Sequence, residues 1–176
     1  MKKQINYRTL FFSAALAIAG MFALNTAAQA QSSASASADA EAKIVSGISL
    51  EKVLDLNFGS IVRSAEGGMV TIDPNSGNIS YSGVTQGQNS NYQAAQFETT
   101  GEADYLYSIS LPSSATLNRN GGNETMTVTD FSYTEGAGTL DTQGAESFDV
   151  GGTLNVGPNQ ATGRYIGSFE VSVQYQ

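Results

Sequence analysis

The chain has 176 residues, a formal net charge of −8, and no cysteine, histidine or tryptophan. Without histidine or cysteine it cannot build a Ser-His-Asp or Cys-His catalytic arrangement, nor the usual ligand sets of zinc, copper or haem. Paired carboxylates or a serine with a lysine remain as catalytic options, and we expect no enzyme, no bound metal and no cofactor.

The N-terminal region is typical of a secretory signal peptide. Basic residues begin the chain, residues 10–24 are apolar, and residues 28–30 read Ala-Gln-Ala, a small-x-small cleavage site. The apolar run is short for a membrane span. We therefore predict a signal peptide over residues 1–30 and a mature chain over residues 31–176. That chain would pass through the periplasm to the cell surface or beyond, with no insertion into a membrane.

The charge of the mature chain restricts its partners. Loss of three basic residues with the signal peptide leaves five basic and sixteen acidic residues, a formal net charge of −11. A surface of this sign repels nucleic acid and anionic lipid, so we expect no nucleic-acid partner.

Residues 31–43 read QSSASASADAEAK, a low-complexity leader of small residues. Such a composition predicts disorder in the free monomer, because alanine and serine bury little apolar surface. Its alternation nevertheless suits a strand if another polypeptide offers an edge. The alternating positions are Ala34, Ala36, Ala38, Ala40 and Ala42, with Ile44 continuing the register.

From residue 44 onward the chain reads as all-β, because short alternating runs are separated by glycine, asparagine, proline and serine. We predict one antiparallel β-sandwich domain over residues 44–176, immunoglobulin-like or pilin-like. The predicted strands are 44–50, 53–58, 68–73, 78–84, 94–99, 104–111, 124–133, 147–156 and 163–175. The predicted core residues are Ile48, Leu50, Leu56, Phe58, Ile61, Val70, Ile72, Phe97, Tyr107, Ile109, Leu111, Met126, Val128, Phe131, Leu154, Val156, Phe169, Val171 and Val173.

The last predicted strand has the clearest alternation, with apolar residues or glycine at every odd position from Tyr165 to Tyr175. A long apolar strand with a free edge promotes aggregation unless another strand covers it. We therefore expect this segment either to lie between strands of its own domain or to pair with another polypeptide.

Several short motifs resemble a family of secreted bacterial domains of unknown function, DUF4402. They are Leu-Asn-Phe-Gly-Ser-Ile at 56–61, Gly-Gly-Met-Val at 67–70, Phe-Glu-Thr-Thr-Gly at 97–101, Tyr-Ser-Ile-Ser-Leu-Pro at 107–112, Val-Gly-Gly-Thr-Leu at 150–154 and Gly-Arg-Tyr-Ile-Gly-Ser-Phe at 163–169. The resemblance covers residues 40–176 and implies no catalytic residues.

The C-terminal segment also resembles that of chaperone–usher pilins and spore-coat-U-like domains. Those subunits have a glycine fourteenth from the end and a penultimate tyrosine, here Gly163 and Tyr175. The resemblance implies a sandwich that lacks its last strand, filled by a periplasmic chaperone and then by the next subunit's N-terminal extension. It implies a fibre or matrix subunit in which residues 31–44 donate a strand. The acceptor groove would be bordered by Gly163, Tyr165, Phe169, Val171, Val173 and Tyr175.

Three alternatives remain open from the sequence. The tyrosines suit a monomeric secreted module that binds a glycan or a surface partner. Asp73, Asn75 and Asn78 place oxygen ligands on one loop and could bind calcium, although turn chemistry alone accounts for them. A carboxylate-based hydrolase would need two acidic side chains at a defined separation, which the sequence does not locate.

Overall fold

A computed structural model describes residues 33–176, so the predicted signal peptide lies outside the described residues. Every regular element in this part of the chain is a strand, which confirms the all-β prediction. The strands are β1 (Ser49–Leu54), β2 (Ile61–Val62), β3 (Gly68–Ile72), β4 (Ile79–Ser82), β5 (Thr85–Gln86), β6 (Ala95–Thr100), β7 (Tyr107–Ser110), β8 (Ser114–Arg119), β9 (Thr125–Tyr133), β10 (Ala145–Val156), β11 (Tyr165–Ile166) and β12 (Ser172–Tyr175).

Two units are distinct in the chain. Lys43–Gln176 forms a compact domain, and residues 33–42 carry no regular secondary structure and are exposed. Across residues 33–176 there is no helix long and apolar enough to cross a membrane.

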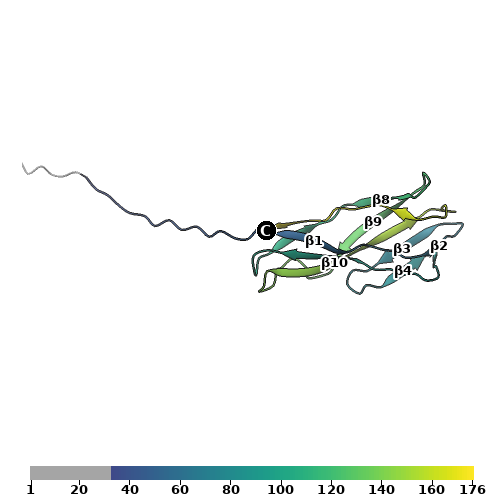
Figure 1. The fold of residues 1–176 in the computed structure, drawn as a ribbon, viewed down its shortest axis with the longest axis horizontal. Helices are drawn as coiled ribbons and strands as arrows, with labels where there is room; N and C mark the ends of the chain where they lie inside the picture. The colour runs from purple at the N-terminus through teal and green to yellow at the C-terminus, as the bar shows by residue number, and fades with distance from the viewer. Residues whose placement is uncertain (1–32) are drawn as a thin grey trace, which may run out of the picture. The chain divides into compact units, whose positions relative to one another are not determined.

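β10 is the central strand of an eight-stranded antiparallel sheet. Its first half pairs with β6 and its second half with β3, while β9 pairs along its other edge. The main path runs β1-β6-β10-β9-β8-β11, and β4 joins beside β3. Figure 1 shows β3 and β4 at the end of the domain away from the C-terminus. β10 therefore belongs to both halves of the sheet and joins them.

A much smaller sheet covers part of one face of this large sheet. β12 pairs with β7, in a ladder from Ser172 opposite Ser110 to Tyr175 opposite Tyr107. Its apolar side chains pack against β6 and β10, where Phe97 stacks on Phe148 with ring centroids 5.7 Å apart. These two layers are therefore unequal, since a two-stranded sheet faces an eight-stranded one. A third sheet consists of β2 and β5, with Ile61 opposite Gln86 and Val62 opposite Thr85.

The core follows the alternation of the sequence. All the predicted core residues are buried or half-buried. The sequence analysis missed several residues of the core, chiefly on β6, β8, β10 and the loops: Val84, Ala95, Ala115, Leu140, Phe148 and Val150. The immunoglobulin-like detail of the sandwich stays a prediction.

Several strand predictions were wrong in part. Residues 55–58 of the predicted strand 53–58 form no strand, because β1 ends at Leu54, and β2 and β5 were not predicted. Residues 44–48 form no strand, because pairing with β6 begins only at Ser49 opposite Thr100. β8 was not predicted, since no predicted strand lies between residues 111 and 124. The predicted strand 163–175 is interrupted, since residues 167–171 lie between β11 and β12 and belong to neither.

We predict that Leu154→Ala destabilises the domain by about 2–5 kcal/mol, because it removes a buried side chain and leaves a cavity. Leu154 is 2 % exposed and stands in β10 between Val70 of β3 and Val128 of β9. Leu106→Ala is the matched control, since Leu106 is 54 % exposed, and should change stability by no more than about 0.5 kcal/mol. Urea unfolding measures both, and equal losses would contradict this account of the core.

Candidate functional site

The domain has an open groove of about 1430 Å³. Residues 55–63 line one part of it, and residues 160–171 line it without interruption. Its floor is formed by apolar side chains of the large sheet, on β6, β8, β9 and β10: Ala95, Phe97, Ala115, Leu117, Met126, Val128, Leu154 and Val156. The groove thus lies where the small second layer leaves the large sheet uncovered.

The size and lining of the groove favour a polypeptide over a small molecule. Pockets for small ligands measure about 300–1,000 Å³ and carry a few convergent polar groups. This groove is larger and its floor is apolar. No group of three or more acidic side chains that could hold a metal is present in residues 33–176.

The segment from β11 to β12 borders the groove with alternating side chains. Tyr165, Phe169, Val171, Val173 and Tyr175 are half-buried, and the residues between them are exposed. The alternation of a strand is therefore present at Tyr165 and from Phe169 onward, and it is interrupted at Gly167, which is exposed. The hydrogen-bonded ladder is not continuous, because β11 pairs with β8 and β12 pairs with β7, which leaves residues 167–171 outside any ladder.

Phe169 anchors this unpaired stretch to the core. Its ring lies 4.8 Å from that of Phe131 and 6.4 Å from that of Phe97, measured between centroids. Val171 and Val173 pack against the buried cluster that contains Phe97 and Phe148. Side-chain packing therefore positions the segment, and the backbone groups of residues 167–171 stay outside the strand pairing of the domain.

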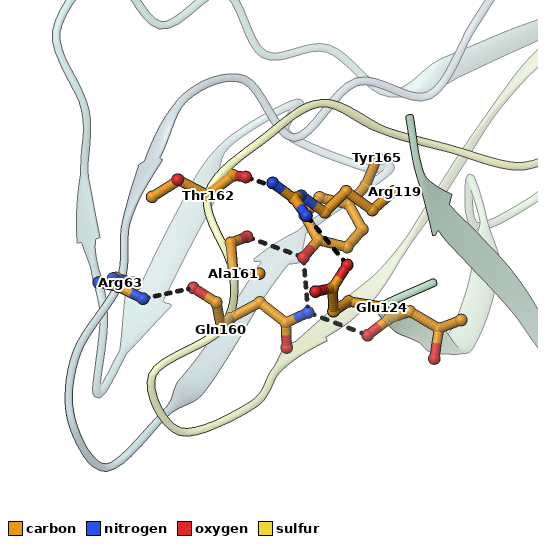
Figure 2. Close-up of polar contacts among 8 residues, drawn as sticks. Arg63, Arg119, Glu124, Gln160, Ala161, Thr162 and Tyr165 are labelled. Carbon is orange, nitrogen blue, oxygen red and sulfur yellow. Dashed lines mark hydrogen bonds and ion pairs between the residues drawn. The ribbon is translucent and has the colours of Figure 1, made fainter. Parts of the chain in front are cut away.

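A cluster of polar contacts, which we call the polar cap, closes one end of the groove (Figure 2). The Arg119 guanidinium donates to the Thr162 carbonyl oxygen at 2.8 Å and pairs with Glu124 at 3.1 Å. The Gln160 amide donates to the Tyr165 hydroxyl at 2.8 Å, and this hydroxyl donates to the Ala161 carbonyl oxygen. These bonds hold the loop before β11 against β8 and β9.

Gly163 has a local reason to be glycine. Its φ of 152° is one that residues with a side chain rarely adopt, and a Cβ there would lie 2.8 Å from Nε of Arg119. The backbone conformation therefore favours glycine at this position, and a Cβ would in addition displace the Arg119 side chain.

A second cluster, which we call the clasp, lies at the end of β12. The Tyr175 hydroxyl donates to the Ser46 carbonyl oxygen at 3.0 Å and accepts the Glu102 N–H at 2.7 Å. Glu102 in turn accepts the Ser46 N–H at 3.1 Å and pairs with Lys43 at 3.0 Å. The clasp therefore ties residues 43–46 to the C-terminal strand. A Cβ on Gly101 would collide with the Tyr175 hydroxyl, so this packing also requires glycine.

The clasp contains an ion pair whose two members shift each other's pKa. The Ser46 N–H and the Lys43 ammonium hold the pKa of Glu102 below its ordinary value of 4.5. The same contact with Glu102 raises the pKa of Lys43. Both groups are therefore charged at neutral pH, and the Lys43 ammonium also lies 5.4 Å from the centroid of the Tyr105 ring.

Comparison with family models gives one match, to the domain of unknown function DUF4402, over residues 48–175. The chain belongs to the DUF4402 family. Comparison with curated proteins and with solved structures gives no match. The description of the family assigns no function to the groove of this DUF4402 domain.

The predicted donor residues form no strand. Ala34, Ala36, Ala38, Ala40 and Ala42 are all exposed. Ile44 is 96 % exposed, the highest exposure among the large apolar side chains of the described residues. The structure brings together the predicted groove residues at 163–171 but places Val173 and Tyr175 beyond the groove, in the β12–β7 ladder.

The residues of the polar cap other than Gly163 and Tyr165 were missed by sequence reasoning. Arg119 and Glu124 flank a glycine- and asparagine-rich stretch that reads as a solvent-exposed turn. The opposite charges at the two sides of that turn, five positions apart, were the available signal.

The alternative sites receive no support from the geometry. The Asp73 carboxylate accepts hydrogen bonds from the Asn75 N–H and the Ser76 hydroxyl, so the loop's own turn occupies it. The tyrosines do not gather on one surface: Tyr107 is 1 % exposed, and Tyr165 and Tyr175 lie in the polar cap and the clasp.

We predict that Tyr175→Phe destabilises the domain by about 1–2 kcal/mol, because two hydrogen bonds to the Tyr175 hydroxyl are lost. Tyr92→Phe is the matched control, since Tyr92 is 37 % exposed and its hydroxyl has no hydrogen-bond partner among the described residues. Thermal unfolding of the two variants measures the difference. Equal midpoints would show that the clasp contributes nothing to stability.

We also predict a loss of stability in acid that depends on Glu102. A carboxyl whose pKa is lowered by folding stabilises the native state above its unfolded pKa, and this contribution is lost as the pH falls. Stability should therefore fall below about pH 4.5, the ordinary value for Glu102. Glu102→Gln should reduce the slope of stability against pH in this range. Urea midpoints between pH 7 and pH 3 test it, and an unchanged slope would contradict the role given to Glu102.

Proposed function

We propose that this DUF4402 chain is a structural subunit of a secreted or cell-surface assembly, which is either a fimbria-like fibre or a matrix. In this assembly a strand from another copy fills the groove. The observation that carries the proposal is the stretch 167–171, which has the alternation of a strand from Phe169 onward and borders an apolar groove but belongs to no ladder.

A strand is the occupant that satisfies both needs of this site. Its alternate side chains would cover the apolar floor, and its backbone would pair with the free groups of residues 167–171. This is strand addition, in which main-chain hydrogen bonds give affinity and alternate side chains give register. A small molecule could cover the floor but would leave the backbone groups of the segment unpaired.

The leader supplies a segment of the right length and pattern. A strand rises about 3.3 Å per residue, so the leader from residue 34 to 44 spans roughly the same 36 Å as residues 165–175. The leader is exposed along its described part. The alanines of the leader are small. They would leave room for the large side chains of Phe169 and Tyr165, which already line the groove.

An unfilled groove is an aggregation hazard during export. We therefore also propose that a periplasmic chaperone covers the groove in transit and that an usher delivers the subunit to the surface. The signal-peptide pattern of residues 1–30 supports this route. No catalytic role enters the proposal.

The test is gel electrophoresis of the assembly from cells that express the full chain, probed with an antibody to the domain. We expect a ladder of bands in unboiled SDS samples that collapses to one band after boiling, because strand-exchanged subunits separate only on unfolding. Replacement of Ala36, Ala38 and Ala40 with lysine should abolish the ladder, since three charges would face the apolar floor.

Replacement of Ser33, Ser35 and Ser37 with lysine is the matched control, because these positions alternate with the alanines and would face solvent. This variant should keep the ladder. A single band without boiling in the unchanged protein would refute the proposal and favour the monomeric binding module instead.

A further inference from the structure

The basic side chains of the domain are unevenly distributed around the groove. Arg63 and Arg164 line the groove where the polar cap closes it. Arg63 donates to the carbonyl oxygens of Asn159 and Gln160, at 3.0 Å each, so no carboxylate neutralises it. Arg164 forms no ion pair with any described residue. In a chain of net negative charge, these two free cations mark one end of the groove.

The rest of the groove carries no free positive charge. Lys52, which also lines it, pairs with Asp55 at 2.6 Å. Glu170 is an exposed carboxylate further along the wall. The two ends of the groove therefore carry opposite charges: the end beside the polar cap is basic, and the end toward β12 is acidic.

Charge is also unevenly distributed along the leader. Ser33, Ser35 and Ser37 carry no charge, whereas Asp39 and Glu41 follow at the next two odd positions. Lys43 comes after them but is paired with Glu102 of its own domain. The free charge of the leader is therefore negative and confined to its second half.

We propose that the basic rim formed by Arg63 and Arg164 seats the acidic half of the leader of a second copy and so sets the orientation of the inserted strand. This inference rests on the proposed function. The strand then runs antiparallel to residues 163–173, with Asp39 and Glu41 beside the polar cap and Ser33 toward β12. Opposite charges facing each other across two strands stabilise the pair, and like charges destabilise it.

The antiparallel register with Glu41 opposite Arg164 satisfies both the charges and the alternation. In this register, the inward-facing alanines lie opposite inward-facing residues, Ala40 opposite Tyr165 and Ala36 opposite Phe169. In the reverse orientation, Ala36 opposite Tyr165 would bring Glu41 opposite Glu170. The charge pattern therefore rejects that reverse alignment.

Disulfide cross-linking of the full exported chain tests the orientation, since the natural sequence contains no cysteine. Glu41→Cys with Arg164→Cys places two thiols opposite each other in the proposed register, and so does Ser33→Cys with Ser172→Cys. The matched control, Ser35→Cys with Arg164→Cys, places the thiols opposite each other only in the reverse alignment, with Ala36 opposite Tyr165. Facing strand positions lie within the Cα separation that a disulfide spans.

After mild oxidation, we expect the first two pairs to give a ladder that survives boiling without reductant, and the control pair to give none. Cross-linking by the control pair alone would overturn the orientation. A heat-sensitive ladder with no cross-link in any pair would overturn the register while leaving the proposed function in place. Absence of a ladder even in unboiled samples of the cysteine-free protein would refute the proposed function itself.

A charge exchange tests the role of the rim. Arg164→Glu should shorten the unboiled ladder by repelling Glu41, and Arg164→Glu combined with Glu41→Arg should restore it. Lys52→Glu is the control, because Lys52 is already paired with Asp55, and should leave the ladder longer than Arg164→Glu does. Equal shortening by Arg164→Glu and Lys52→Glu, without rescue by the exchange, would contradict a specific role for the rim.

Discussion

The rest of the structure depends on the unequal size of its two layers. An amphipathic sheet must bury its apolar face against another element. Here the large sheet presents side chains from β6, β8, β9 and β10, and the β12–β7 sheet covers only part of them. The groove, the half-buried aromatic residues along it and the unpaired stretch 167–171 all follow from this shortage of covering strands.

Two polar clusters compensate for the missing cover at the two ends of the C-terminal segment. The polar cap fixes the loop before β11 through Arg119 and Gln160, and the clasp fixes the end of β12 through Tyr175. Between them, Phe169 packs into the core. The segment is thus held at both ends and by one ring in the middle, while its backbone stays available for pairing.

The sequence predicted side-chain burial better than strand pairing, and the physical reason is visible at residues 163–175. Alternation records which side chains face the core, and that prediction is confirmed at Tyr165 and from Phe169 onward. A ladder needs a neighbouring backbone at the right distance, which depends on residues far away in the chain. For the same reason residues 44–48 alternate without forming a strand, since pairing with β6 begins at Ser49.

β8 was missed for a different reason. Its sequence, Ser-Ala-Thr-Leu-Asn-Arg, contains few residues typical of strands, yet Ala115 is buried and Leu117 half-buried against the core. The groove could not be found from the sequence either, because its floor combines residues from four strands. Gly163 and Tyr175 were singled out by resemblance, and the structure supplies local reasons for both: the approach of Arg119 and the hydrogen bonds of the clasp.

The clasp has a mechanical consequence for an assembly joined through the leader. Tension on the leader would reach the domain at residues 43–46 and pass through the Tyr175 hydroxyl into β12, which is bonded to β7 along its length. A load directed along these strands strains the whole ladder at once instead of opening it bond by bond. Resistance to force depends on the rate of unfolding and not on equilibrium stability. The hydrogen bonds of the Tyr175 hydroxyl would therefore contribute to the force at which each subunit unfolds.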